Sequence, residues 1–238
     1  REAEQRMTST VAADPAMDRD EVVVLGKGIE YKWIVAGVYV LALFLDILDV
    51  TIVNVALPDI GRKLMSDNVE WVVIGYTLAL AVSIPLAGWW SDWIGTKKAF
   101  LISLLFFLGG SAACGFAHTM SQLITFRILQ GVGGGMLTPV GMAMMYRAFK
   151  PSERARAATV VMVPTLLAPA LGPILGGVIT TNFGWKWIFW VNLPVGAIAF
   201  LFGWLYVREH REPTVGRFDA PGFVLSAAGL TLTLFSLS

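Results

Sequence analysis

The sequence predicts an all-α integral membrane protein, and two features of its composition lead to this class. Of the 238 residues, 56% are hydrophobic and only 15% are charged, whereas a soluble domain has roughly 25% charged residues. The hydrophobic residues also gather in runs of about 20, the length that a helix needs to cross a hydrocarbon core about 30 Å thick. We therefore expect six complete membrane-spanning helices and the start of a seventh. Their predicted spans are residues 33–57, 71–90, 99–117, 121–145, 157–180, 187–207 and 222–238.

The predicted spans divide the chain into four parts. These are a polar tail at 1–32, a six-helix bundle at 33–207, a link at 208–221 and a truncated seventh helix at 222–238. The tail lacks the short apolar core and cleavage site of a signal peptide. Met7 is a candidate natural start, and Ser238 lies inside a hydrophobic run. We therefore expect a fragment of a longer protein.

The distribution of basic residues predicts the orientation of the chain in the membrane, because loops on the cytoplasmic side carry an excess of Lys and Arg. The tail and the loops after the second, fourth and sixth spans hold 14 of these residues. The alternate loops hold only Arg62, Lys63 and Lys186. This pattern predicts a multi-pass protein of the cell membrane, with a cytoplasmic N-terminus and a cytoplasmic link after the sixth span.

Several other function classes are disfavoured. The formal net charge is +1 and the basic residues form no stripe, so no nucleic-acid partner is expected. Cys114 is the only cysteine, and its spacing from His118 and His210 offers no metal site. The sequence shows no nucleophile–base set. We therefore expect neither an enzyme nor a cofactor.

The first span contains two acidic residues, Asp46 and Asp49. An ionisable residue in the middle of a membrane helix costs roughly 2.5–3.5 kcal/mol on insertion scales and usually serves a function. Carboxyl groups in apolar surroundings are natural proton carriers, because burial favours their neutral form. The chain is therefore interpreted first as a proton-coupled membrane transporter.

Arg127 is a second costly residue, inside the fourth span. At 1.5 Å per residue, Asp49 lies roughly 13 Å and Arg127 roughly 9 Å from the outer ends of their spans. An ion pair between them would relieve both desolvation penalties, and Asp46 would lie slightly deeper on a neighbouring face. The hypothesis is that these three residues respond to protons and substrate. The alternative is a fixed ion pair that only locks helix packing.

Small residues and prolines concentrate in the fifth and fourth spans. The fifth span holds Pro164, Pro169, Gly172, Pro173, Gly176 and Gly177, which predicts a bent helix with a thin face. Gly172 and Gly176 have the spacing that permits close backbone approach, and Gly131 and Gly135 repeat it in the fourth span. For each pair, generic helix packing is the alternative interpretation.

The loop after the second span combines one acid with two bases beside helix ends. It holds Gly88, Asp92, Gly95 and Lys97, followed by Lys98. Such a loop can latch neighbouring helices through charge and helix dipoles. The alternative is an ordinary loop that follows the positive-inside rule.

A weak similarity between two segments of the sequence indicates a bundle built from two related parts. Pro85-Leu86-Ala87-Gly88 in the second span is similar to Pro173-Ile174-Leu175-Gly176 in the fifth, and Asp49 and Arg127 occupy matching spans. Three-plus-three inverted repeats are known in the halves of transporters.

Taken together, these strings resemble the major facilitator superfamily, and within it the fourteen-helix drug:proton antiporters. The string from Leu48 to Pro58, which includes Asn54, is similar to the first-helix motif. Arg127, Gln130 and Gly131 match the fourth-helix motif, whose arginine the family uses in proton coupling. Gly172, Pro173, Gly176 and Gly177 match the fifth-helix antiporter motif, with Ala168 in place of a glycine. The string from Trp185 to Gly196 is similar to one typical of the fourteen-helix branch.

The loop motif departs from the family pattern. Gly88, Asp92, Gly95 and Lys97 match it, whereas Trp93 and Thr96 stand where the superfamily usually has arginines and Trp90 replaces a leucine. These departures bear on the strength of the cytoplasmic latch and leave the expected fold unchanged. The link after the sixth span is short, and in this it resembles the corresponding link of the fourteen-helix branch.

The resemblance implies the six-helix N-terminal half of a major facilitator fold, built as a three-plus-three inverted repeat, plus the start of a seventh helix. It implies export of small lipophilic or cationic drugs in exchange for protons. Asp46, Asp49, Asn54, Arg127 and Gln130 would then form the proton and substrate site. A periplasmic adaptor protein is a further candidate partner. The alternatives are a dedicated metabolite exporter, an uptake symporter, and a non-transporting membrane sensor.

Overall fold

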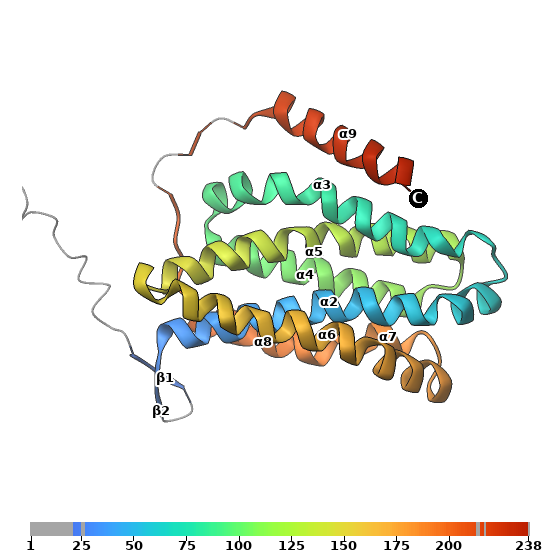
Figure 1. Cartoon of the computed structure of the whole chain (residues 1–238), viewed down its shortest axis with the longest axis horizontal. Coiled ribbons are helices and arrows are strands. Elements are labelled where there is room, and N and C mark those ends of the chain that lie inside the picture. Colours follow the sequence, from blue (N-terminus) through green and yellow to red (C-terminus); the bar gives the residue numbers. More distant parts are fainter. Residues whose placement is uncertain (1–20, 25–26, 213–214, 217, 238) are drawn as a thin grey trace, which may run out of the picture.

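The computed structural model describes residues 21–24, 27–212, 215–216 and 218–237, and Figure 1 shows their arrangement. The predicted fold class is confirmed, since six helical segments of the described chain are long and apolar enough to cross a membrane. The first five are α2 (Tyr31–Leu64), α3 (Trp71–Ile94), α4 (Thr96–Phe116), α5 (Met120–Ala148) and α6 (Arg154–Asn182). The sixth combines α7 (Trp187–Trp190) and α8 (Asn192–Tyr206), and α9 (Ala220–Leu237) follows.

Most helices extend beyond the predicted spans. The 34 residues of α2 correspond to about 51 Å at 1.5 Å per residue, well above the roughly 30 Å of a hydrocarbon core. A hydrophobic run marks only the part of a helix that lies in the apolar layer, whereas the hydrogen-bonded helix continues past it. For the same reason α3 continues to Ile94, so that Asp92 lies in its last turn rather than in a loop.

Two features were not predicted from the sequence. Strands β1 (Glu21–Val24) and β2 (Lys27–Glu30) pair antiparallel, with Glu21 opposite Glu30, directly before α2. The sixth span is interrupted at Val191, between α7 and α8. Pro194 in the first turn of α8 explains the interruption, because proline has no N–H to offer the carbonyl four residues earlier.

The helices pack as two related sets of three. In the first set, α2 packs against α6 and α8. In the second, α5 packs against α3 and α4. The two sets meet where α2 contacts α5 and where α4 contacts α8, and α9 lies along α3 (Figure 1). Exchanging α2 with α5, α3 with α6 and α4 with α8 reproduces these contacts, which is the pattern of an inverted repeat.

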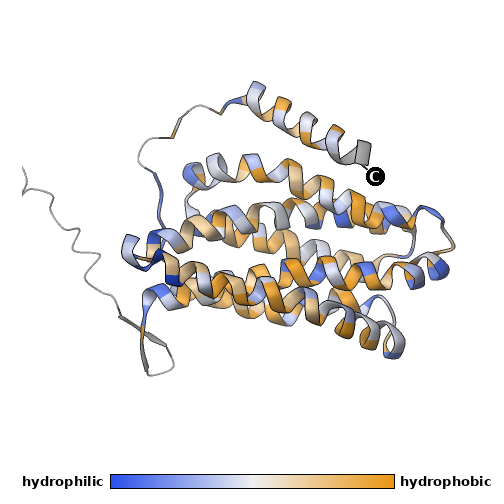
Figure 2. Ribbon diagram, viewed as in Figure 1, coloured by the Kyte–Doolittle hydropathy of each residue, from blue (hydrophilic) through white to orange (hydrophobic). Residues whose placement is uncertain are grey.

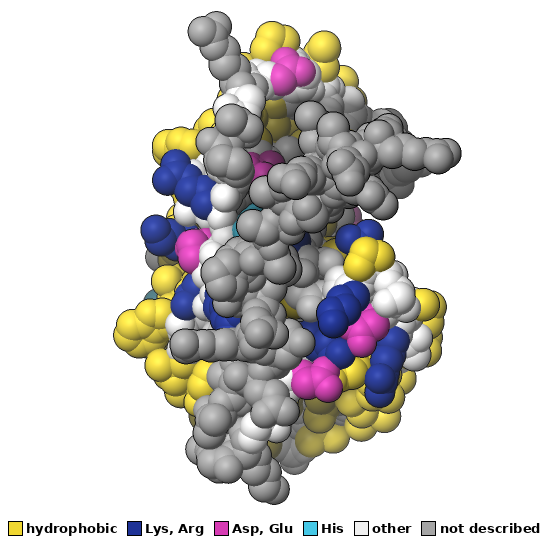
Figure 3. All heavy atoms as spheres, turned by 90° about the vertical axis from the view of Figure 1, so that its left-hand side faces the viewer, with side chains coloured by type: hydrophobic (Ala, Val, Ile, Leu, Met, Phe, Trp, Pro, Cys, Tyr) yellow, Lys and Arg dark blue, Asp and Glu magenta, His cyan; other side chains and the backbone are white. Residues whose placement is uncertain are grey.

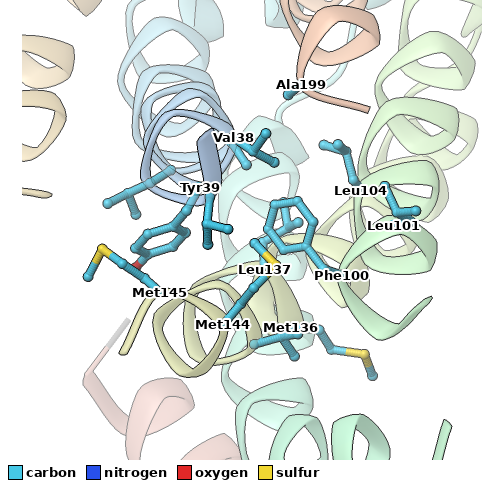
Figure 4. Close-up of a cluster of buried hydrophobic side chains, with 14 of the residues drawn as sticks. Val38, Tyr39, Phe100, Leu101, Leu104, Met136, Leu137, Met144, Met145 and Ala199 are labelled. Atoms are coloured by element: carbon cyan, nitrogen blue, oxygen red, sulfur yellow. The ribbon is translucent and has the colours of Figure 1, made fainter. Parts of the chain in front are cut away.

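Buried hydrophobic side chains fill the bundle between α2, α4, α5 and α8. Figure 4 shows part of this core, with Tyr39 of α2 lying toward Met145 of α5 and Phe100 of α4 lying toward Leu137 of α5. The outer faces of the bundle are also apolar, with large exposed side chains such as Leu166, Ile174 and Trp204. Hydrophilic residues lie mainly toward the two ends of the bundle (Figure 2). A hydrophobic exterior of this kind suits a lipid surrounding.

One end of the bundle is rich in basic residues. The β1–β2 hairpin, the α3–α4 and α5–α6 junctions and the residues after α8 all lie at the left of Figure 1. Figure 3 faces this end and shows several Lys and Arg side chains around it. We call it the basic end.

Candidate functional site

The structure brings Asp49 of α2 and Arg127 of α5 into direct contact. The Nη1 of Arg127 donates to Oδ2 of Asp49, and each residue is only 1% exposed. The similar depths estimated from the sequence account for this meeting, because α2 and α5 run in opposite directions and touch at the centre of the bundle. A buried pair of this kind is tolerated where further hydrogen bonds satisfy both partners.

Those further hydrogen bonds come from three helices. The Nε2 of Gln130 and the Nδ2 of Asn192 each donate to Oδ1 of Asp49 at 2.9 Å. Arg127 also donates from Nη1 to Oε1 of Gln130 at 2.9 Å and from Nε to the carbonyl of Val72 at 3.3 Å. Both oxygens of the Asp49 carboxylate are therefore occupied by donors from α5 and α8.

Asp46 reaches the ion pair through a tyrosine. The hydroxyl of Tyr76, on α3, donates to Oδ1 of Asp46 at 2.5 Å. The guanidinium of Arg127 lies over the Tyr76 ring, 4.0 Å from its centroid, in cation–π geometry. Both carboxylates are thus linked to one arginine, Asp49 by direct contact and Asp46 through the hydroxyl of the ring on which the guanidinium lies.

A second layer ties the ion pair to α4 and α8. Asn192 also donates from Nδ2 to Oγ of Ser111 at 3.0 Å, and Ser111 donates to the carbonyl of Phe189 at 2.9 Å. The thiol of Cys114 contacts Oε1 of Gln130 at 3.8 Å. The Oδ1 of Asn192 is buried and has no hydrogen-bond partner among the described residues.

The structure separates Asn54 from this cluster. Asn54 is exposed on α2, and no hydrogen bond joins it to the cluster in the described part of the chain. Conversely, sequence reasoning did not single out Tyr76, Ser111 or Asn192. The signal for Asn192 was present, since it is a polar residue inside the string from Trp185 to Gly196 that carries the family resemblance.

The glycines of α5 allow three neighbours to approach closely. A Cβ on Gly131 would lie 2.5 Å from the carbonyl oxygen of Tyr76, and one on Gly135 would meet the backbone of Leu80, both on α3. A Cβ on Gly134 would lie 2.7 Å from Oδ1 of Asp46 and 2.6 Å from the hydroxyl of Tyr76. The absence of a side chain at 134 therefore leaves room for the Asp46–Tyr76 hydrogen bond.

The small residues of α6 divide into two faces. Gly172 lies against Thr51 of α2, and a Cβ on Gly176 would lie 3.2 Å from the Cβ of Val55 and 3.3 Å from the carbonyl oxygen of Ile52. Pro173 is exposed and a Cβ on Gly177 would meet nothing within 4 Å, so both point away from α2. Only half of the predicted motif forms the close contact.

At the basic end, Arg147 of α5 joins α3 to the residues after α8. Its Nη2 lies 3.6 Å from Asp92 and 2.8 Å from Glu212, and its Nη1 donates to Oγ1 of Thr96 at 2.7 Å. The Nζ of Lys97 donates to the carbonyl of Trp204 at 2.6 Å.

The two glycines predicted for the latch differ in their surroundings. Gly95 has φ +101° where α3 turns into α4, and the Glu209 side chain fills the space beside it. Gly88 is exposed, and a Cβ there would meet nothing within 4 Å. The structure therefore gathers Asp92, Gly95 and Lys97 and leaves Gly88 outside.

Six apolar helices around a buried ion pair, with the contacts of an inverted repeat, are the architecture of a multi-pass membrane protein. The family model of the Major Facilitator Superfamily matches residues 39–237. The chain belongs to this superfamily.

Similar proteins carry names connected with drug resistance. The chain is 44% identical over 207 residues to the multidrug resistance protein B homolog of Mycobacterium tuberculosis, covering 85% of this chain and 38% of that protein. It is 38% identical to the putative multidrug resistance protein MdtD of Salmonella paratyphi B, covering 86% of this chain and 43% of that one. The chain thus spans about two fifths of the length of these curated relatives.

A solved structure supports the fold. The human organic anion transporter MFSD10 superposes with a TM-score of 0.67 at 21% identity, covering 86% of this chain and 55% of the transporter. The predicted resemblance to a multidrug efflux permease of this superfamily, with its N-terminal half represented here, is confirmed by these comparisons.

The two hydrogen bonds of the Asn192 amide lead to a prediction about stability. Asn192→Leu keeps a similar volume but removes the amide that donates to Asp49 and Ser111. We expect a loss of about 1–3 kcal/mol, the usual consequence of leaving buried polar groups without partners, measured by thermal unfolding in detergent. The control is Ser111→Ala, which leaves all donors to Asp49 in place and should cost less. An equal loss in the two variants would show that Asn192 acts through its contact with α4 alone.

Proposed function

We propose that the complete transporter exports small lipophilic or cationic drugs in exchange for protons. The observation that carries this proposal is the fully buried Asp49–Arg127 pair, closed by Gln130 and Asn192. The similarity to multidrug resistance proteins supports drugs as the substrate class.

The geometry suggests how protons act on this site. A proton on Asp49 removes the charge that faces Arg127 and weakens its contacts with the two amides. Arg127 then keeps its contact with the Tyr76 ring, beside Asp46, so the arginine has a second acidic partner within reach. Protonation would thus shift the helices that carry these groups, α2, α3, α5 and α8. The membrane potential supplies about 2.3 kcal/mol per charge per 100 mV to drive such a cycle.

The orientation and the packing motifs are part of the proposal. The basic end would face the cytoplasm, the orientation that its excess of Lys and Arg favours. Gly172 and Gly176 form a close-packed α2–α6 contact, from which Pro173 and Gly177 point away, and Gly131 and Gly135 form its counterpart between α5 and α3. The Asp92–Arg147 contact and Lys97 act as the cytoplasmic latch. A periplasmic adaptor remains a candidate partner.

The test uses the complete transporter in inside-out vesicles. The vesicles are energised to acidify the lumen, a panel of lipophilic cations is added, and a lumenal dye reports pH. We expect substrate-triggered proton release that is lost in Asp49→Asn. A sensor of the same fold predicts no release with any compound and no effect of neutralising Asp49 or Arg127. A dedicated metabolite exporter predicts release with one compound class only, and an uptake symporter predicts higher substrate accumulation in cells.

A further inference from the structure

A surface hollow of about 400 Å³ lies at the basic end, away from the Asp49–Arg127 site. It is lined by Trp90, Trp93 and Ile94 of α3, Lys98 and Ile102 of α4, and Arg211 after α8. Four of these six side chains are apolar and two are cationic. The hollow therefore offers an apolar wall with positive charge at its edge.

The two cations of the hollow are not engaged elsewhere in the described part of the chain. The neighbouring acids have other partners, since Asp92 and Glu212 both contact Arg147. The carboxylate of Glu209 accepts the backbone N–H of Lys97 at 3.0 Å. No ion pair to Lys98 or Arg211 occurs among the described residues.

One further observation concerns a hydrogen-bond donor beside these cations. The buried Nε1 of Trp90 is a donor without a partner among the described residues. An anionic oxygen in the hollow would meet the two cations, Lys98 and Arg211, beside a buried indole N–H that has no partner among the described residues.

We propose that this hollow binds the headgroup of an acidic phospholipid, with the first part of an acyl chain against Trp90, Trp93 and Ile102. The apolar wall favours a lipid over free phosphate, because a free anion would leave that wall in water. Aromatic and basic side chains at the interface are the groups that hold lipids there. The site is separate from the proton and drug site, so it acts on the stability or conformation of the transporter.

The test is lipid binding to the purified complete transporter, followed by native mass spectrometry. The ligands are phosphatidylglycerol, phosphatidylethanolamine and glycerol phosphate. We expect preferential binding of phosphatidylglycerol. Because one cation near the surface contributes about fivefold in affinity, Lys98→Gln with Arg211→Gln should weaken binding about 30-fold.

The matched control is Lys150→Gln with Arg154→Gln, which removes the same charge at the same end of the bundle. It should leave phosphatidylglycerol binding nearly unchanged. Equal weakening in both double variants would overturn the proposal in favour of a general attraction to acidic lipid. Equal binding of phosphatidylethanolamine, or of glycerol phosphate, would also overturn it. Thermal unfolding confirms that each variant is folded.

Discussion

Arg127→Met will destabilise the protein by about 3–5 kcal/mol at neutral pH, because it leaves Asp49 as a buried carboxylate with no cation beside it. Among the described residues, Arg127 is the only buried cation. Gln130 and Asn192 keep their hydrogen bonds to Asp49 in the variant, but neutral amides do not balance a full charge. The measurement is thermal unfolding in detergent.

A second substitution separates stability from transport. Asp49→Asn added to Arg127→Met removes both charges, and it should recover most of the lost stability while substrate-triggered proton release stays absent. A double variant as unstable as Arg127→Met alone would contradict the ion-pair explanation. It would instead assign the loss to the packing of Arg127 on Tyr76.

Gly176→Leu will abolish transport by the complete transporter while leaving membrane insertion intact. The backbone of α6 lies against α2 at this point, and even a Cβ would stand 3.2 Å from Val55. A leucine side chain must push the two helices apart, and overpacking of this kind typically costs 1–3 kcal/mol. The measurement is drug efflux from cells, normalised to the amount of transporter in the membrane.

The neighbouring glycine provides the control. Gly177 is one residue away and a Cβ there would meet nothing within 4 Å, so Gly177→Leu should insert equally well and retain most of the efflux. Loss of efflux in Gly177→Leu alone would show that the working face of α6 is the one that points away from α2.

The centre of the site could be predicted from the sequence because it depends on depth. The rise per residue of a helix is fixed, so the positions of Asp49 and Arg127 along antiparallel spans determine that they lie at the same height. The cost of burying either charge alone then favours their pairing. The spans could be predicted for a similar reason, since the length of an apolar run follows the thickness of the membrane.

The remaining partners could not be predicted because they depend on the rotation of each helix. Tyr76 points at Asp46 only because α3 is turned that way in the bundle, and no sequence pattern fixes this angle. Asn54 shows the opposite case, since it lies five residues from Asp49 and thus about 140° around the helix. That angle alone argues against placing Asn54 and Asp49 in the same cluster. Pro194 was likewise a signal for the break before α8, but the uninterrupted hydrophobic run led to the prediction of a single helix.

The single cysteine of the chain allows the interior of the bundle to be probed by chemical labelling. Cys114 is fully buried, 3.8 Å from the side-chain oxygen of Gln130. A maleimide can reach it only when the surrounding helices separate, so the rate of thiol modification reports how often this half of the protein opens. The effects of proton gradients and of drugs on this opening can then be compared through that rate, with no engineered cysteine in the six-helix bundle.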